Sequence, residues 1–248
     1  MERQLGPVLE KLARIAGLLW QKGWAEANAG NISINLTGIL AVKSHKVVGE
    51  RPLLTPRSEL AGQSFLVTAT GSRMRDLAGD PAGGVGLITI SEDGEGYHVT
   101  WQGAERFSPS SELDSHLAIH GLLVSHGSDC RAVLHAHPDE LIAVSLRREF
   151  QSEKALNELL MSMHPEATVA FPEGVGLVPY VLPGSDELLG ATMRAFKNHR
   201  VVIWANHGAI SVGRDLEEAF DLMDILNKMA RIFLINNANQ PVSGLGEK

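Results

Sequence analysis

The sequence predicts one α/β domain, residues 1–248, with a mostly antiparallel central sheet covered by helices. Three observations lead to this fold class. Segments with apolar residues at helical spacing are interspersed with short segments that alternate or are uniformly apolar, as strands are. These segments do not follow the regular strand–helix–strand order that a parallel sheet requires. No internal repeat, low-complexity tract or linker-like stretch divides the chain.

The first part of the chain predicts one helix followed by strands. Apolar residues at 5, 8, 9, 12, 15, 16 and 19 repeat with helical spacing, and Gly23 ends this helix. Residues 32–36 alternate like a half-buried strand. Residues 37–62 have no clear period, and we expect a long connection or weak strands there. Further strands are predicted at 65–69, 85–90 and 97–101, the last two paired across the glycine-rich turn 93–96.

From Ser111 onward, helices and strands are intermixed without a regular order. Apolar spacing indicates a helix that begins near Ser111. Pro138 opens a helix that extends to about Arg148, because proline suits the first helical position. The final helix begins at Asp215, with Glu218 three residues later as a variant of the capping box. The other elements predicted here are strands at 131–135, 176–182, 201–205 and 209–212, and helices at 152–163 and 188–196.

Composition excludes several classes of partner. The net charge is −7 and no run of Lys or Arg is present, which argues against nucleic acid and anionic membranes. No apolar run approaches the roughly 18 residues that a membrane span needs. The N-terminus lacks the apolar core of a signal peptide, and the single cysteine, Cys130, fits a reducing compartment. We therefore expect a cytoplasmic protein.

The strongest chemical signal is the pair His135 and His137. Side chains at i and i+2 of a strand face the same side, so two imidazoles there can share one metal ion. The apolar residues before the pair and Pro138 after it place both histidines at the end of a strand, where a metal and a substrate can enter.

A catalytic zinc typically has three protein ligands and one open position. His207 is the candidate for the third ligand, because it also follows an apolar strand and Gly208 lets the backbone turn tightly. A rival set consists of His116 and His120, four residues apart on one helix face, with Glu112 one turn earlier. The residues alone leave both sets open.

Three short polar turns offer hydroxyl or amide groups and exposed backbone N–H groups that can bind an anion. They are Asn28–Asn31, Thr70–Arg73 and Ser108–Ser111. Each is also explained by an ordinary turn, and Ser110 and Ser111 by capping of the helix that follows.

Two carboxylates have alternative interpretations. Glu112 lies at the start of a helix, where it either complements the helix dipole or acts as a general base beside the metal. Glu166 lies in a loop-like stretch before 169–171, where the sequence alone favours a solvated acid.

Taken together, these motifs resemble the class II aldolase/adducin family over nearly the whole chain. The resemblance rests on Gly23–Asn31, Thr70–Ser72, Ser110–Glu112, His135–His137, Phe171–Pro179, Pro183–Glu187 and His207–Gly208. The stretch from Phe171 to Glu187 resembles the branch of the family that acts on L-rhamnulose 1-phosphate.

The resemblance implies specific roles for site residues. Zinc would be held by His135, His137 and His207, and Glu112 would be the base. Glu166 would reach the active site of a neighbouring subunit and assist proton transfer at the aldehyde. The phosphate of the sugar would contact the polar residues Asn28, Asn31, Ser72, Ser110 and Ser111. Arg73 and Met74 stand where this branch often has Gly-Lys, so Arg73 or Arg75 would compensate.

The resemblance also implies an activity and an assembly. The expected reaction is reversible cleavage of L-rhamnulose 1-phosphate to dihydroxyacetone phosphate and L-lactaldehyde through an ene-diolate. The expected assembly is a homotetramer with active sites at subunit interfaces. Alternatives within the family are an L-fuculose-1-phosphate aldolase, an epimerase or a dehydratase. A non-catalytic, adducin-like binding protein is a further alternative, disfavoured because such members lack the metal histidines.

Overall fold

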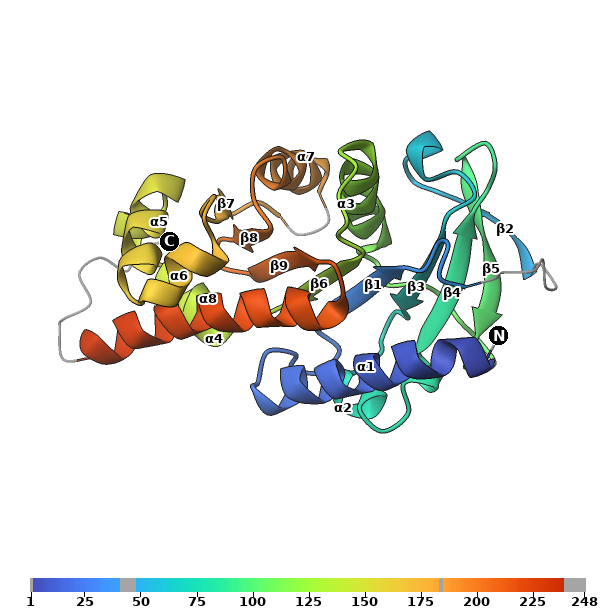
Figure 1. Ribbon diagram of the computed structural model, residues 1–248, viewed down its shortest axis with the longest axis horizontal. Helices are drawn as coiled ribbons and strands as arrows, with labels where there is room; N and C mark the ends of the chain where they lie inside the picture. The colour runs from blue at the N-terminus through green and yellow to red at the C-terminus, as the bar shows by residue number, and fades with distance from the viewer. Residues whose placement is uncertain (1, 41–47, 183–184, 239–248) are drawn as a thin grey trace.

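One mixed sheet organises the computed structural model, which describes residues 2–40, 48–182 and 185–238 (Figure 1). The strand order is β2-β5-β4-β3-β1-β6-β9-β8-β7, and every neighbouring pair is antiparallel except β7 and β8. The predicted mostly antiparallel α/β fold is therefore confirmed. The strands are β1 Asn31–Asn35, β2 Val48–Pro52, β3 Ser64–Thr68, β4 Val85–Ile90, β5 Gly96–Gln102, β6 Ala132–Ala136, β7 Gly176–Val178, β8 Val201–Trp204 and β9 Gly208–Gly213.

Helices cover both faces of this sheet. Figure 1 shows α1, α2 and α8 along one face and α3 and α7 on the other. The shorter helices α4, α5 and α6 pack against α8. The helices are α1 Glu2–Gln21, α2 Met74–Leu77, α3 Leu113–Ser125, α4 Asp139–Ser145, α5 Glu153–Ser162, α6 Pro165–Ala170, α7 Asp186–Phe196 and α8 Leu216–Asn236.

Alternation along the central strands sends side chains to opposite faces of the sheet, where the described residues form three core clusters. On β6, Ala132 and Leu134 join the core beneath α1 and α8, whereas Val133 joins the core beneath α3 and α7. The same alternation applies to β1, which the sequence predicted to be half-buried. That prediction was wrong, because all five residues of β1 are buried. Its polar face, which includes Ser33, packs against α3 instead of meeting solvent.

Several short elements differ from the prediction. The helix expected to reach Arg148 ends at Ser145, whose hydroxyl donates to the Ile142 carbonyl and accepts the N–H of Asn206. The stretch before 169–171 is not a loop but the helix α6, with Pro165 in its first turn and His164 as its cap. Helix α2 was also not predicted, since four residues give no detectable period.

The connection 37–62 contains the predicted weak strand and a short 3₁₀ turn. The strand is β2, at the edge of the sheet, and the turn spans Ser58–Leu60. The part of the connection at 41–47 lies outside the described residues.

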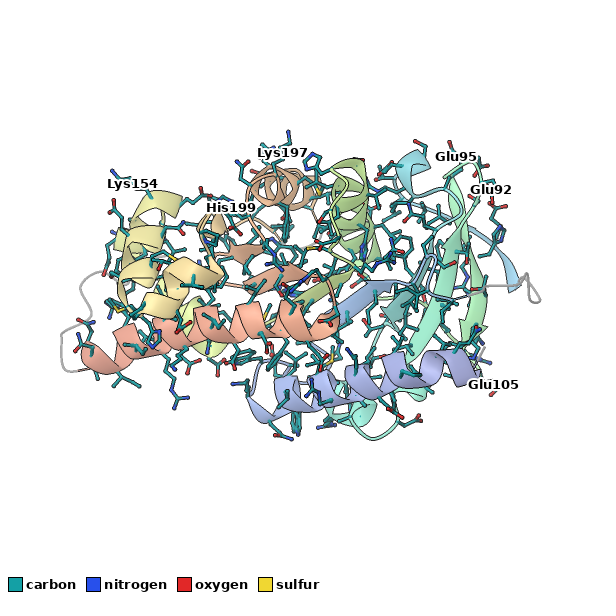
Figure 2. The ribbon with its side chains drawn as sticks, in the orientation of Figure 1. Glu92, Glu95, Glu105, Lys154, Lys197 and His199 are labelled. Carbon is teal, nitrogen blue, oxygen red and sulfur yellow. The ribbon has the colours of Figure 1, made fainter. Side chains whose placement is uncertain are left out.

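Many charged side chains lie on the periphery of the molecule. Figure 2 labels examples that point outward and are exposed: Glu92, Glu95, Glu105, Lys154 and Lys197. None of the described helices combines the length and the apolar character needed to cross a lipid bilayer. The extent predicted for the domain, 1–248, stays a prediction.

Candidate metal centre and active site

The register of the sheet brings three distant segments together at one end of its central strands. Asn31, the first residue of β1, pairs with His135 on β6. On the other side of β6, Ala136 pairs with Ala209 at the start of β9. The turn that joins β8 to β9 contains His207 and therefore lies beside the end of β6.

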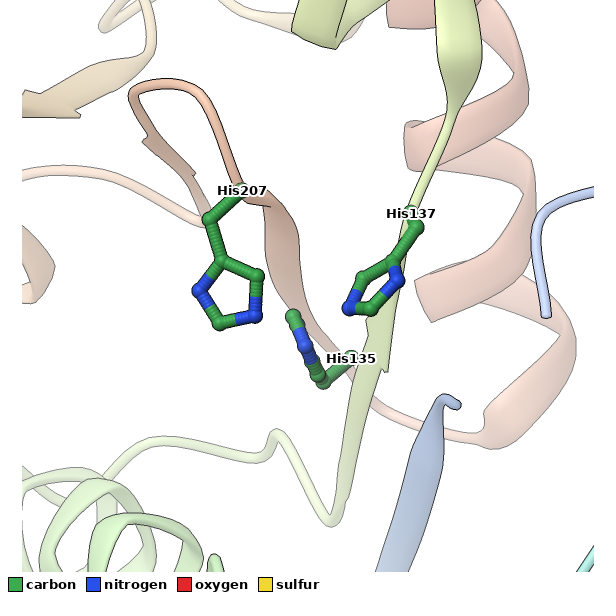
Figure 3. Close-up of side chains that lie close together, drawn as sticks. All are labelled: His135, His137 and His207. Carbon is green, nitrogen blue, oxygen red and sulfur yellow. The ribbon is translucent and has the colours of Figure 1, made fainter. Parts of the chain in front are cut away.

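The three predicted metal ligands face one another at this end of the sheet. Figure 3 shows the rings of His135, His137 and His207 converging. One nitrogen from each ring lies within 4.8 Å of the others, and the ring centroids are 5.0–5.1 Å apart. The structure thus unites two histidines of β6 and its extension with one that lies far along the chain, in the β8–β9 turn.

Hydrogen bonds leave the Nε2 atoms of two rings free for a metal. The Nδ1–H of His135 donates to the carbonyl of Ala209 at 2.9 Å, and that of His137 donates to the Glu26 carboxylate at 2.9 Å. Both acceptors lack a proton, so each imidazole is protonated at Nδ1. The Nε2 atom of His135 is buried and has no hydrogen-bond partner among the described residues. A metal-binding histidine commonly donates the N–H of its other ring nitrogen to a carboxylate or a backbone carbonyl, and this hydrogen bond fixes the orientation of the ring.

Glu26 was not assigned a role from the sequence, although it lies in the motif Gly23–Asn31 that carries the family resemblance. Its place in that motif was the one feature of the sequence that could have marked Glu26 as a site residue. Its contact partner, His137, is more than a hundred residues away, so no local pattern connects the two.

The environment keeps His135 and His207 neutral. Trp204 lies beneath the cluster, with ring centroids 4.8 Å from His135 and 5.2 Å from His207. Burial, partly offset by Glu112, lowers the pKa of His135 to about 4. Burial and the nearby His137 also lower the pKa of His207. Neutral imidazole is the form that binds a metal.

Gly208 is needed for a different reason from the one predicted. The residue with a left-handed backbone in this turn is Asn206, with φ of 63°. A Cβ at position 208 would lie 2.5 Å from the carbonyl oxygen of Ala136 and 3.0 Å from Cδ2 of His137. The absence of a side chain therefore allows the β8–β9 turn to approach the end of β6.

Glu112 stands beside the cluster at the N-terminal end of α3. Its Oε2 atom is 3.9 Å from His135 Nε2 and accepts a hydrogen bond of 2.9 Å from the Asn31 amide. Burial opposes ionisation of this carboxyl, but His135 and the Asn31 amide outweigh burial and lower the pKa of Glu112. The site thus combines a three-histidine cluster with an ionised carboxylate.

The three predicted anion-binding turns also meet at this end of the sheet. β3 runs antiparallel to β1, so its end lies near the start of β1, and Ala69 forms an isolated bridge with Pro109. Ser110 lines a small pocket with Asn31, and Ser111 and Asn28 are exposed. The Asn31 amide is engaged by Glu112, a contact that the predicted phosphate role did not include.

A separate cavity of about 350 Å³ opens beside the turn at Ser72. Arg73 lines it, whereas Arg75 packs over the ring of Trp20. Of the two arginines named from the sequence, only Arg73 is therefore placed near Ser72. Arg106 lines the same cavity and was missed, because nothing in its local sequence marks it as a binding residue.

Glu166 lies on the exposed first turn of α6. Among the described residues, no hydrogen bond or ion pair joins its side chain to Glu112 or to the three histidines. The structure of one chain therefore does not bring Glu166 into the site.

The rival metal set does not form. His116 uses both ring nitrogens in hydrogen bonds, Nε2 to Asn31 and Nδ1 to Ser33. His120 also contacts Ser33, through Nε2 at 2.8 Å. Within residues 2–40, 48–182 and 185–238, only the trio His135, His137 and His207 gathers three ligand atoms as a metal site requires.

Comparisons with known proteins agree with this geometry. The family model described as "Class II Aldolase and Adducin N-terminal domain" matches residues 10–234. The chain belongs to this family. Class II aldolases depend on a metal ion, and the three-histidine cluster could hold one.

Individual members of the family are similar over most of their length. A rhamnulose-1-phosphate aldolase from Bacteroides thetaiotaomicron is 39% identical over 233 residues, covering 93% of this chain and 86% of that protein. The crystal structure of a sugar-phosphate aldolase from Thermotoga maritima is 30% identical, with a TM-score of 0.82 and coverage of 98% and 99%. An L-fuculose-1-phosphate aldolase from Thermus thermophilus shares the fold at 21% identity, with a TM-score of 0.59 and coverage of 94% and 95%.

Replacing Gly208 by Ala tests whether the close approach of the β8–β9 turn to the end of β6 assembles the metal site. The added Cβ meets the Ala136 carbonyl at 2.5 Å, so the turn that contains His207 must move away. We expect affinity for Zn²⁺, measured by competition with a chelating dye, to fall roughly ten- to a hundredfold. Gly6→Ala on α1, where a Cβ meets nothing within 4 Å, is the control and should retain the wild-type affinity. Equal affinity in both variants would contradict the argument.

Acid destabilisation tests the burial of His116 and His120. Burial lowers the pKa of His116 to about 4 and that of His120 to about 3, whereas an unfolded histidine titrates near 6.5. The unfolded chain therefore binds more protons below pH 6.5, and the free energy of unfolding falls as the pH falls from about 6.5 to about 4. The free energy of unfolding is measured by urea denaturation of metal-free protein at a series of pH values. In His120→Leu its change with pH should be smaller by up to about 1.4 kcal/mol per pH unit. An unchanged slope would show that His120 is not held neutral.

Proposed function

We propose that the protein is a zinc-dependent aldolase that reversibly cleaves L-rhamnulose 1-phosphate to dihydroxyacetone phosphate and L-lactaldehyde. The observation that carries this proposal is the position of Glu112, whose carboxylate lies 3.9 Å from Nε2 of His135 in the three-histidine cluster. A base beside a metal site is what removal of a proton next to a carbonyl requires. The relatives named rhamnulose-1-phosphate aldolase support the choice of sugar.

The donor set suits zinc. His135, His137 and His207 offer three neutral nitrogen ligands, and such sites leave one position open for substrate. The unpartnered, buried Nε2 of His135 supports the fit, because a buried polar atom without a partner is costly unless a ligand completes it. When bound, zinc would supply Lewis-acid stabilisation of the negative charge that develops on the oxygens of the ketose.

Glu112 is the group that moves the proton. In the condensation direction, its carboxylate removes a proton from the hydroxymethyl carbon of dihydroxyacetone phosphate, which gives the ene-diolate. In the cleavage direction, the bond between C3 and C4 breaks, and Glu112, after taking up a proton from solvent, gives that proton to C3. The lowered pKa of Glu112 keeps it ionised at neutral pH, as a base must be.

The phosphate would bind at the polar turns beside the cluster. Asn28, Ser110 and Ser111 provide polar groups at this end of the sheet. Ser72 lies in the turn that follows Ala69, which forms a bridge with Pro109. The Ser72 hydroxyl now donates to the Gly84 carbonyl. Arg73 and Arg106 line the cavity next to Ser72 and supply positive charge in a chain whose net charge is −7.

Cleavage also needs a base for the hydroxyl of C4, which becomes the aldehyde. Glu26 is committed to His137, and Glu112 serves C3. We propose Glu166 of a neighbouring subunit for this role, in a homotetramer with active sites at subunit interfaces. Its exposed position on α6 makes it available to another copy. The predicted cytoplasmic location stays a prediction.

A panel of ketose 1-phosphates tests the proposal. Purified protein is incubated with L-rhamnulose, L-fuculose and D-fructose 1-phosphates, with and without a chelator, and dihydroxyacetone phosphate is measured by a coupled reductase. We expect the L-rhamnulose compound to be cleaved fastest and the chelator to stop cleavage. Faster cleavage of the L-fuculose compound would favour the L-fuculose alternative. No cleavage of any member by zinc-loaded protein would reject the aldolase proposal.

The variant His137→Ala should lose bound metal and turnover together, because two nitrogen ligands hold zinc far more weakly than three. Metal content by mass spectrometry and the rate of dihydroxyacetone phosphate release are the measurements. His199→Ala, on a histidine outside the cluster, is the matched control and should retain both. A His137→Ala protein that is metal-free and fully active would refute the zinc role.

The variant Glu112→Gln should keep its zinc but lose most of its activity. The amide has nearly the shape of the carboxylate but cannot accept a proton, and a positioned general base contributes roughly 10²–10⁴-fold. We therefore expect kcat to fall by about that factor with metal content unchanged. Turnover at the wild-type rate would remove Glu112 from the mechanism.

A further inference from the structure

A row of buried polar side chains connects Glu112 to the interior of the protein. Glu112, His116 and His120 follow one another at intervals of four along α3, so they lie on one helix face. Asn31 and Ser33, two apart on β1, lie on the strand face that packs against this helix. The four residues beyond Glu112 are at most 7% exposed.

Hydrogen bonds join the five residues in an unbroken order. The Asn31 amide contacts Glu112 Oε2 at 2.9 Å, and its carbonyl oxygen contacts Nε2 of His116. The hydroxyl of Ser33 lies 2.7 Å from Nδ1 of His116 and 2.8 Å from Nε2 of His120. Each link therefore alternates between the helix and the strand.

The carboxylate at one end fixes the direction of every bond. Ionised Glu112 can only accept, so Asn31 must present its NH₂ group to it. The Asn31 oxygen then needs a donor, which is Nε2–H of His116. Neutral His116 accepts through Nδ1, so the Ser33 hydroxyl donates to it and accepts from Nε2–H of His120.

The surroundings of Nδ1 of His120, the last atom in the row, are consistent with this direction of the hydrogen bonds. The assignment leaves Nδ1 of His120 as a bare acceptor, and that atom is buried with no hydrogen-bond partner in the part of the chain that the structure describes. The reverse assignment would bury an unpartnered N–H at the same place. Burial also lowers the pKa of His116 and of His120, which is consistent with two neutral rings at pH 7.

We propose that His116 is a positioning residue, which, supported by Ser33 and His120, locks the amide of Asn31 so that its N–H holds the Glu112 carboxylate beside the metal site. The inference rests on the proposed function of Glu112 as the base. Without the donor from His116, the Asn31 amide is free to turn, and its oxygen would then face the carboxylate and repel it. The orientation of a base in an active site is worth large factors in rate.

Turnover of variants tests this role. We expect His116→Leu to lower kcat for ketose 1-phosphate cleavage roughly ten- to a hundredfold, the value of one hydrogen bond to a charged group. KM and zinc content should stay unchanged. His116→Gln, which retains a side-chain N–H donor, should recover most of the loss. The control His98→Leu, on a partly buried histidine of β5 outside the row, should leave kcat unchanged.

The results that would overturn the proposal are equally specific. Wild-type kcat in His116→Leu would show that the row does not position Glu112. A loss carried by KM, or accompanied by loss of zinc, would show that His116 serves packing instead. If His116→Leu fails to fold, Ser33→Ala removes the middle link while keeping both rings, and kcat must fall in it too.

The tautomers provide a test that does not depend on activity. In ¹⁵N-histidine spectra of the wild-type protein we expect His116 and His120 to be protonated at Nε2, and His135 at Nδ1. A proton on Nδ1 of His116 would overturn the proposal even if the enzyme is active. If the wild-type protein cleaves no ketose 1-phosphate, the proposed function fails, and the tautomers still decide whether the row is ordered as described.

Discussion

The approach of the β8–β9 turn to the end of β6 is the constraint on which the site depends. Two histidines on one strand can be placed by local sequence, but the third ligand must come from another element. The turn reaches His137 only because Gly208 has no side chain to meet the Ala136 carbonyl. Asn206, in a left-handed backbone conformation, and the hydroxyl of Ser145, which accepts its N–H, hold the turn in this place. Packing of α4, the helix that contains Ser145, is thereby linked to the geometry of the metal site.

The second constraint is that the polar face of β1 is buried and must be satisfied internally. Unpaired polar groups in a core cost free energy, and paired ones specify a unique arrangement. The isoleucines of β1 pack beneath α1 and α8, and two of its polar residues, Asn31 and Ser33, find partners on α3. The strand therefore fixes α3 in register as well as in position. Because Glu112 directly precedes α3, this register also sets the distance between the carboxylate and His135.

The sequence predicted most of the fold because the central strands and long helices carry strong periodic signals. The spacing of His135 and His137 predicted that their rings lie together, and the strand end before His207 predicted the third. The partners Glu26 and Asn31 were not predictable as partners, since each contacts a residue more than eighty positions away. Local patterns do not encode which strands become neighbours.

The errors have related causes. The alternation of β1 has the same form whether its polar face meets water or another helix, so the sequence could not reveal that His116 and Ser33 meet. Helix α6 is six residues long and shows no period, so Glu166 was placed in a loop. Gly208 was correctly singled out, but the reason was a contact with Ala136 across the sheet and not the conformation of its own backbone.

Charge balance gives an independent reason for a cation at this site. Burial keeps His135 neutral at pH 7, while the neighbouring Glu112 side chain is ionised and only 23% exposed. Glu26, bound to His137, adds a second negative charge nearby. One amide from Asn31 is modest compensation for a partly buried carboxylate, since buried charges are usually paired or bound to metal. A divalent cation between the three imidazoles would balance the two carboxylates, so the same burial that lowers the pKa of His135 and His207 also favours the metal.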